Sequence, residues 1–228
     1  MKKMLAAAMA IGLLTSACAS TNIKTTTQDF AAPSVETSTI LLKPDVQMFS
    51  ILASGILEAR ADWSIAAQEN MQTALESALN DRASNVYFMD PDAELTEDQI
   101  QVLKLKDAVL LASKNYYLLK NKKDVFDLTL GPDAAVLANG TDAEFALVVS
   151  AQGSFQSAGK IAVNIAMAMI GGTIQTGIQL ATLSLVDLET GHVVWTNTAT
   201  LGAGASDPRT LPGAEKVVNT LLKDFPLE

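Results

Sequence analysis

The chain of 228 residues carries a net charge of −9, and 49% of its residues are hydrophobic. Residues 1–17 hold Lys2 and Lys3 and no acidic residue, so the net charge of −9 becomes −11 without them. This acidic balance argues against binding to nucleic acid, or to anionic lipid through charge, and the hydrophobic content argues against a disordered chain.

The first seventeen residues have the layout of a secretory signal. Lys2 and Lys3 come before an uncharged run, residues 5–14, and three small residues, 15–17, follow it. The run is shorter than the roughly 20 residues that a permanent transmembrane helix needs. We therefore expect residues 1–17 to be a removable signal peptide.

Cys18 is the only cysteine, which excludes a disulfide within the chain. Its place directly after the small residues resembles a lipobox, in which the cysteine sulfur carries a lipid and the peptide is cut before it. Thr15 stands where a lipobox usually has leucine. Cleavage after Ala19 is the alternative, and it would discard the cysteine. We favour lipidation of Cys18, and Ala19 in place of Asp indicates the periplasmic face of the outer membrane, by resemblance to enterobacterial sorting.

The segment 18–37 is predicted to be the lipidated cysteine and a flexible tether, because it is rich in Thr, Ser and Ala and shows no period. Residues 38–228 are predicted to form one periplasmic domain. Its first elements are a buried strand over 38–43 and a bent extended pair over 46–52 and 56–58.

Two helices are predicted next. The first runs from Trp63 to about Arg82, with Asp62 as its N-cap and apolar residues at helical spacing. A short strand over 85–89 separates it from the second, which starts at the capping box 96–99 and reaches about residue 120.

The second half of the domain alternates strands and helices. A short helix is expected over 133–137, a central strand over 145–151, and a helix or apolar connection from about Ser157. Two strands, 179–187 and 193–198, flank a turn at Gly191, and an amphipathic helix over 213–224 ends the chain. This order predicts an α/β or α+β fold, a small mixed sheet flanked by helices with a late antiparallel hairpin.

No catalytic, cofactor or metal motif is visible in the sequence. His192 is the only histidine and falls in the predicted turn, where a solvated loop residue is the simplest interpretation. Acidic residues over 90–98 suit a helix start, and they lack the glycine and glutamate of a calcium loop. Gly159-Lys160-Ile161 lacks the hydroxyl residue of a P-loop.

Residues 161–174 contain no charge, and only Asn164 and Thr173 are polar. The run is too short to span a membrane and is interrupted by two glycines, so a buried core helix is the favoured interpretation. The alternative is an exposed, methionine-rich face that meets a partner subunit or a membrane. The residues of this candidate partner surface are Ile161, Ile165, Met167, Met169 and Ile170.

Three segments, 40–71, 126–149 and 185–198, resemble an uncharacterised family of proteobacterial lipoproteins, and the likeness extends from about residue 39 to 226. The closing pattern, 187–195, is also similar to the α/β domain of the curli secretion lipoprotein, the lipoprotein activators of penicillin-binding proteins, and the N-terminal domain of TolB. The resemblance implies a small mixed sheet in periplasmic proteins that assemble with envelope partners. It also implies that Val193 and Trp195 share one sheet face, with Val194 on the other.

We therefore expect a non-enzymatic outer-membrane lipoprotein that acts as an accessory or scaffold in envelope assembly or secretion, through self-association or a protein partner. The alternative is a binding module for a small envelope ligand, a peptidoglycan fragment or a lipid, with residues 161–174 as a pocket wall. A third hypothesis, an enzyme of glycosidase type, needs a carboxylate pair that the sequence does not place.

Replacement of Cys18 by serine tests the anchor. We expect the membrane-extracted wild type to start at Cys18 with a triacyl mass, because the lipid is attached through the cysteine sulfur, which serine lacks. The Cys18→Ser variant should lose that mass in intact mass spectrometry. An unmodified wild-type chain that starts at Ser20 would contradict the prediction.

Overall fold

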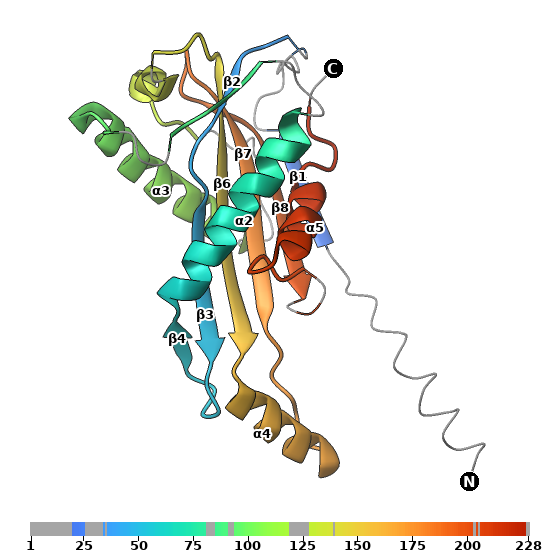
Figure 1. The fold of residues 1–228 in the computed structure, drawn as a ribbon. Helices are drawn as coiled ribbons and strands as arrows, with labels where there is room; N and C mark the ends of the chain where they lie inside the picture. The colour runs from blue at the N-terminus through green and yellow to red at the C-terminus, as the bar shows by residue number, and fades with distance from the viewer. Residues whose placement is uncertain are drawn as a thin grey trace.

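The computed structural model describes residues 20–25, 34, 36–80, 85–90, 94–118, 128–138, 140–202, 204 and 206–226. In this part of the chain eight strands form one mixed sheet, and helices lie on both of its faces (Figure 1). The predicted fold class is thereby confirmed. Cys18 and the predicted signal peptide, residues 1–17, lie outside the described residues.

The sheet is built around β6 (Phe145–Gln156), which has strands on both edges. One edge pairs antiparallel with β7 (Ile178–Asp187), which in turn pairs with β8 (Val193–Gly202), so the predicted late hairpin is confirmed. The other edge pairs in parallel first with β2 (Thr39–Leu41) and then with β3 (Asp45–Ile51). The remaining strands are β1 (Ser20–Thr25) beside β8, β5 (Val86–Phe88) beside β2, and β4 (Leu57–Ala59) beside β3.

The two faces of the sheet bury separate apolar clusters, because successive side chains of a strand point to opposite faces. Leu147 and Val149 of β6 lie in one cluster, and Ala146 and Val148 lie in the other. Each cluster is covered by a pair of helices, and Leu147 and Val149 face the first pair. The first pair is α2 (Ala61–Asn80) with α5 (Leu211–Leu221), and the second is α3 (Glu97–Leu118) with the 3₁₀ helix η1 (Pro132–Ala138).

The predicted capping box at the start of α3 is confirmed. The backbone N–H of Gln99 donates to Thr96 Oγ1 at 3.2 Å, and Thr96 N–H donates to Gln99 Oε1 at 2.9 Å. The predicted N-cap of α2 is wrong. That helix begins at Ala61, so Asp62 lies in its first turn and accepts hydrogen bonds from the Arg60 side chain.

The prediction of a flexible tether over 18–37 is wrong for part of that segment. Residues Ser20–Thr25 form β1, which pairs antiparallel with β8 from Ser20↔Thr200 to Thr25↔Trp195. The outer edge of β8 needs a partner for its backbone N–H and C=O groups, and three β-branched residues in this short segment suit a strand. The aperiodic composition therefore concealed an edge strand.

The alternation implied for residues 193–195 is wrong as well. Val193 lies in the cluster on the α3 side, whereas Val194 and Trp195 both lie in the cluster under α2 and α5. The register of β7 and β8 shifts between Leu185 and Val186. A β-bulge of this kind sets two residues opposite one, so two successive side chains turn toward the same face.

Replacement of Gly191 by alanine tests the tight turn between β7 and β8. Gly191 has a φ of +75°, and a Cβ there would lie 2.0 Å from the carbonyl oxygen of Gly131. We expect Gly191→Ala to lower the free energy of unfolding by more than about 3 kcal/mol in urea denaturation, as severe steric conflicts do.

Gly140→Ala is the matched control. Gly140 has a φ of +78° and nothing within 4 Å of a Cβ. We therefore expect Gly140→Ala to lower the free energy of unfolding by only about 1–2 kcal/mol, the usual cost of a left-handed conformation for a residue other than glycine. Equal losses in the two variants would refute the close approach of the Gly131 backbone.

Candidate functional site

Helix α4 (Ala158–Met169) lies beyond the end of the sheet, between β6 and β7, and apart from the helices that cover the two faces (Figure 1). Ser157 is its N-cap and accepts a hydrogen bond from Lys160 N–H at 3.1 Å. Ser157 N–H donates to Ile51 O at 3.0 Å, and a Cβ on Gly159 would lie 3.4 Å from Ala53 Cβ. These contacts join α4 to the turn between β3 and β4.

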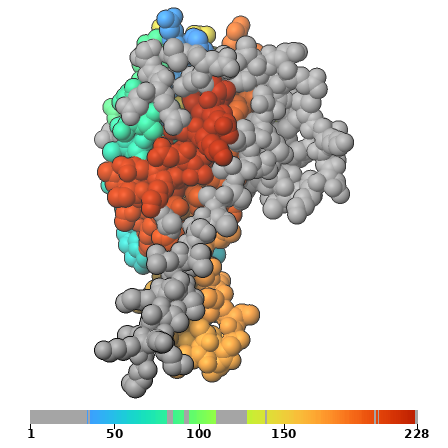
Figure 2. Space-filling model, turned by 90° about the vertical axis from the view of Figure 1, so that its right-hand side faces the viewer, coloured from blue at the N-terminus to red at the C-terminus, as the bar shows by residue number. Residues whose placement is uncertain are grey.

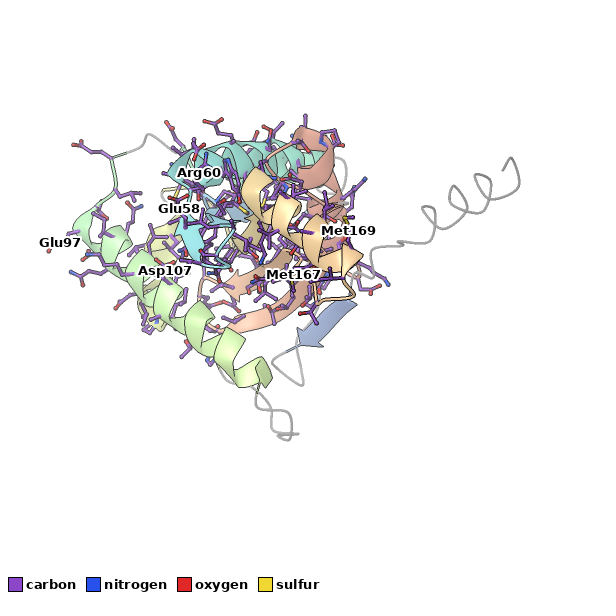
Figure 3. The ribbon with its side chains drawn as sticks, turned by 90° about the horizontal axis from the view of Figure 1, so that it is seen from below. Glu58, Arg60, Glu97, Asp107, Met167 and Met169 are labelled. Carbon is purple, nitrogen blue, oxygen red and sulfur yellow. The ribbon has the colours of Figure 1, made fainter. Side chains whose placement is uncertain are left out.

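We call this region the α4 end. It comprises α4, the connection 170–177 that follows it, and the β3–β4 turn, residues 52–56. Figure 2 shows α4 projecting from the body of the molecule, and Figure 3 views the molecule from this side.

The side chains of α4 have an inverted distribution. Ile165 is 59% exposed, Met169 83% and Ile170 78%, whereas Lys160 and Asn164 are both 8% exposed. The helix therefore packs on the protein with its polar side and presents its apolar side outward. This corrects the favoured sequence interpretation, because residues 161–174 do not form a buried core helix.

The polar side of α4 is occupied by neighbouring segments of the same chain. Asn164 Nδ2 donates to Gln175 O at 2.7 Å, and Gln175 N–H donates to Asn164 Oδ1 at 3.4 Å, which fastens the connection 170–177 to the helix. Lys160 Nζ lies 3.9 Å from the position of a Cβ on Gly55, so it faces the β3–β4 turn. The Asn164 amide thus helps to hold the polar side of α4 inward.

The structure brings together most of the predicted surface and extends it. Met167 is the exception among the five predicted residues, because it is half-buried, and its Cε lies 2.6 Å from the position of a Cβ on Gly172. Part of the extension lies in the β3–β4 hairpin. There the apolar pair Ile56-Leu57, directly after Gly55, is the signal that the sequence gives. The exposed apolar residues of the extended surface are Ile161, Ile165, Met169 and Ile170, which were predicted, and Ile56, Leu57, Val163, Ile174 and Ile178, which were not.

The part of this surface formed by α4 and the connection carries no charged side chain turned outward, whereas in the hairpin part the exposed Glu58 follows Leu57. From residue 161 to 186 the sequence has no charged residue. At the border, Arg60 Nη2 lies 2.6 Å from Asp62 Oδ2, and the Arg60 guanidinium lies 4.3 Å from the centre of the Trp63 ring. The hydrogen bond from Arg60 lowers the pKa of Asp62 and raises the pKa of Arg60, so both groups hold their charges through the neutral range.

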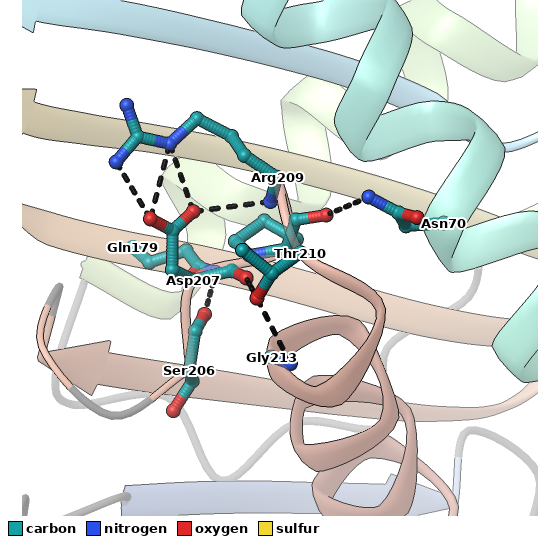
Figure 4. Close-up of polar contacts among 8 residues, drawn as sticks. Asn70, Gln179, Ser206, Asp207, Arg209, Thr210 and Gly213 are labelled. Carbon is teal, nitrogen blue, oxygen red and sulfur yellow. Dashed lines mark hydrogen bonds and ion pairs between the residues drawn. The ribbon is translucent and has the colours of Figure 1, made fainter.

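A second polar group joins β8 to α5 and serves the fold (Figure 4). The Arg209 side chain donates to the Asp207 carboxylate at 2.6 Å, and its guanidinium lies 4.1 Å from the centres of the Trp63 and Phe155 rings. Asn70 Nδ2 donates to Pro208 O at 3.1 Å. These contacts fasten the connection between β8 and α5 to α2. The Arg209 guanidinium contacts the Asp207 carboxylate and the two aromatic rings.

Other sequence candidates do not gather into a site. His192 is half-buried and forms an isolated antiparallel bridge with Thr129. Within the described residues, no three His, Cys, Asp or Glu side chains are placed to hold a metal ion, and no helix is long and apolar enough to cross a membrane. Three hollows of about 290 to 350 Å³ are lined by other elements, and α4 lines none of these three.

No protein-family model matches this chain, and a comparison with curated proteins finds no match. Among solved structures, the chain is similar to the PelC dodecamer from Paraburkholderia phytofirmans in space group P6, with a TM-score of 0.45 and 11% identity over 92% of this chain and 99% of that chain. A PelC variant dodecamer from the same organism, in space group C2, gives the same values. Protein XCC0632 from Xanthomonas campestris gives a TM-score of 0.35 and 10% identity over 86% of this chain and 84% of that chain. At these scores the likeness carries no inference about function, and the dodecamer is a property of PelC.

Replacement of Asn164 by leucine tests how the α4 end is held. The variant removes both hydrogen bonds to Gln175, each worth about 1 kcal/mol, so we expect amide exchange at Gln175 to accelerate about tenfold or more. Exchange in β6–β8 should not change. Asn70→Leu is the control, because its amide fastens a different connection; an equal acceleration at Gln175 in that variant would contradict the assignment.

Proposed function

We propose that the protein is a non-enzymatic lipoprotein of the bacterial envelope, anchored through Cys18 at the periplasmic face of the outer membrane, that acts as an accessory or scaffold through contacts. The observation that supports this proposal is the inverted burial of α4. A contiguous exposed apolar surface is unfavourable in water, and soluble proteins rarely keep one that nothing covers. The α4 end is therefore a contact surface.

The chemistry of this surface favours contact over catalysis. General acid–base catalysis needs a side chain with a pKa near the working pH within reach of a substrate. The outward residues from 161 to 170 are Ile, Val, Ala and Met, which supply neither a proton nor a nucleophile. The one charged side chain of α4, Lys160, points toward the β3–β4 turn.

The scaffold part of the proposal concerns the rest of the molecule. An α4 end that is covered leaves the acidic body, with its sheet edges and the outer sides of α2, α3 and α5, available for other copies of the chain or for envelope proteins. The alternative of a small-ligand module has less support, because the apolar side chains of residues 161–174 project outward rather than around a hollow.

Cysteine accessibility in native membranes tests whether the α4 end is covered. Because Cys18 is the only native cysteine and its sulfur carries the proposed lipid, an introduced cysteine is the sole free thiol. We expect Ile165→Cys to react much more slowly than Ile65→Cys with a membrane-impermeant maleimide after the outer membrane is permeabilised.

The two positions are closely matched, because Ile165 is 59% exposed on α4 and Ile65 is 56% exposed on α2. Both cysteines should react equally once detergent has extracted the protein. Equal rates already in membranes would refute the proposed contact surface. Labelling of the wild type would show that the Cys18 thiol is free and would count against the anchor alone.

A further inference from the structure

We propose that the α4 end docks on a lipid bilayer and places its exposed apolar side chains in the headgroup region, on the same side of the molecule as the lipid of Cys18. This inference rests on the proposed function, in which the α4 end is covered, and names the bilayer surface as what covers it. Three observations favour lipid over a second protein.

The first observation is the direction in which the chain enters the sheet. Ser20, the first residue of β1, pairs with Thr200, which pairs with Leu180 of β7, two residues after Ile178, where the connection from α4 ends. From Ser20 the strand then runs away from α4, toward Trp195. Cys18 stands two residues before Ser20 in the sequence, at most about 7 Å of extended chain. A lipid on Cys18 therefore starts from the α4 half of the molecule.

The second observation is the composition of the outward surface. Between residues 161 and 170 the exposed side chains are Ile, Val, Ala and Met, and the exposed hydrogen-bonding side chains of the α4 end lie in the connection and the turn, at Ser54, Thr173, Gln175 and Thr176. Protein interfaces carry about one hydrogen bond per 100–200 Å² within a polar rim, whereas hydrocarbon requires none. The apolar hairpin residues Ile56 and Leu57 widen the same surface.

The third observation is the position of the charges. Lys160 is the one charged residue of α4 and is turned inward, and the body is acidic, so attraction to anionic lipid plays no part. Docking of this kind is hydrophobic. It should occur on neutral phosphatidylcholine, and it should resist salt, because only charge attraction is screened.

The backbone limits the depth of insertion. A helix of 12 residues is about 18 Å long, too short to span the hydrocarbon core. Residues 172–177 form neither helix nor strand, and irregular backbone is not tolerated against lipid chains. The α4 end thus reaches the interface between headgroups and acyl chains, roughly 5–10 Å deep, as interfacial helices do.

Site-specific fluorescence on the lipidated full chain tests the proposal. Met169→Cys, labelled with an environment-sensitive dye, is reconstituted through its lipid into phosphatidylcholine vesicles, with Ile65→Cys as the control. We expect the emission at position 169 to shift to shorter wavelength, to be quenched by lipids with spin labels on their acyl chains, and to be shielded from aqueous iodide. The label at position 65 should show the reverse, at low and at high salt.

A second substitution links the signal to the apolar surface. Ile165→Asp in the Met169→Cys protein should lower the ratio of docked to undocked protein about tenfold, which corresponds to 1.4 kcal/mol, and Ile65→Asp should not change this ratio. Both substituted positions are exposed, so the fold should persist in each variant, and circular dichroism can verify this.

The outcomes separate this inference from the proposed function. A label at position 169 that is shielded from iodide but not quenched by lipid would overturn bilayer docking and leave a protein-contact surface in place. A label fully open to iodide in vesicles and in native membranes would overturn both. Strict dependence on phosphatidylglycerol, or release by salt, would also contradict a hydrophobic docking surface.

Discussion

The parallel pairing of β3 with the second half of β6 determines how the rest of the molecule is arranged. Its ladder runs from Asp45↔Ser150 to Ile51↔Gln156 and continues the edge that β2 begins. β2 pairs with the first residues of β6 and β3 pairs with its second half, so β6 extends beyond β2 and carries the chain to the far end of the sheet. Ser157 then binds the carbonyl of Ile51, so α4 starts where this ladder ends. The position of the α4 end is thus a consequence of strand length.

The elements with strong local signals were predictable. The hydroxyl of Thr96 and the amide of Gln99 form the capping box within four residues, and Gly191 adopts a positive φ of +75°, which glycine accepts without a steric penalty. The uncharged, β-branched stretch of β6 indicates a strand buried on both faces. In each case the determining contacts lie close together in the sequence or follow one period.

The misinterpreted elements depend on partners that lie far away in the sequence. β1 is a strand because β8, more than a hundred residues later, offers an open edge. The direction of α4 could not be inferred from its composition, because an uncharged helix fits a core as well as a membrane surface. The spacing of Lys160 and Asn164, one turn apart, marks a polar side, but only the β3–β4 turn and Gln175 determine that this side faces inward. The contribution of Ile56 and Leu57 likewise depends on the pairing of β3 with β6.

The antiparallel pairing of β1 with β8 has a mechanical consequence. The chain enters β1 at Ser20, on the side nearer α4, and runs along six residues of β8. A force applied through the preceding chain from that side acts along the strand axis, so the hydrogen bonds of the ladder bear it together in shear. Had the chain entered β1 beside Trp195, the same force would peel the bonds apart one at a time. The observed direction of β1 therefore resists a pull on the chain before Ser20 more strongly than the opposite direction would.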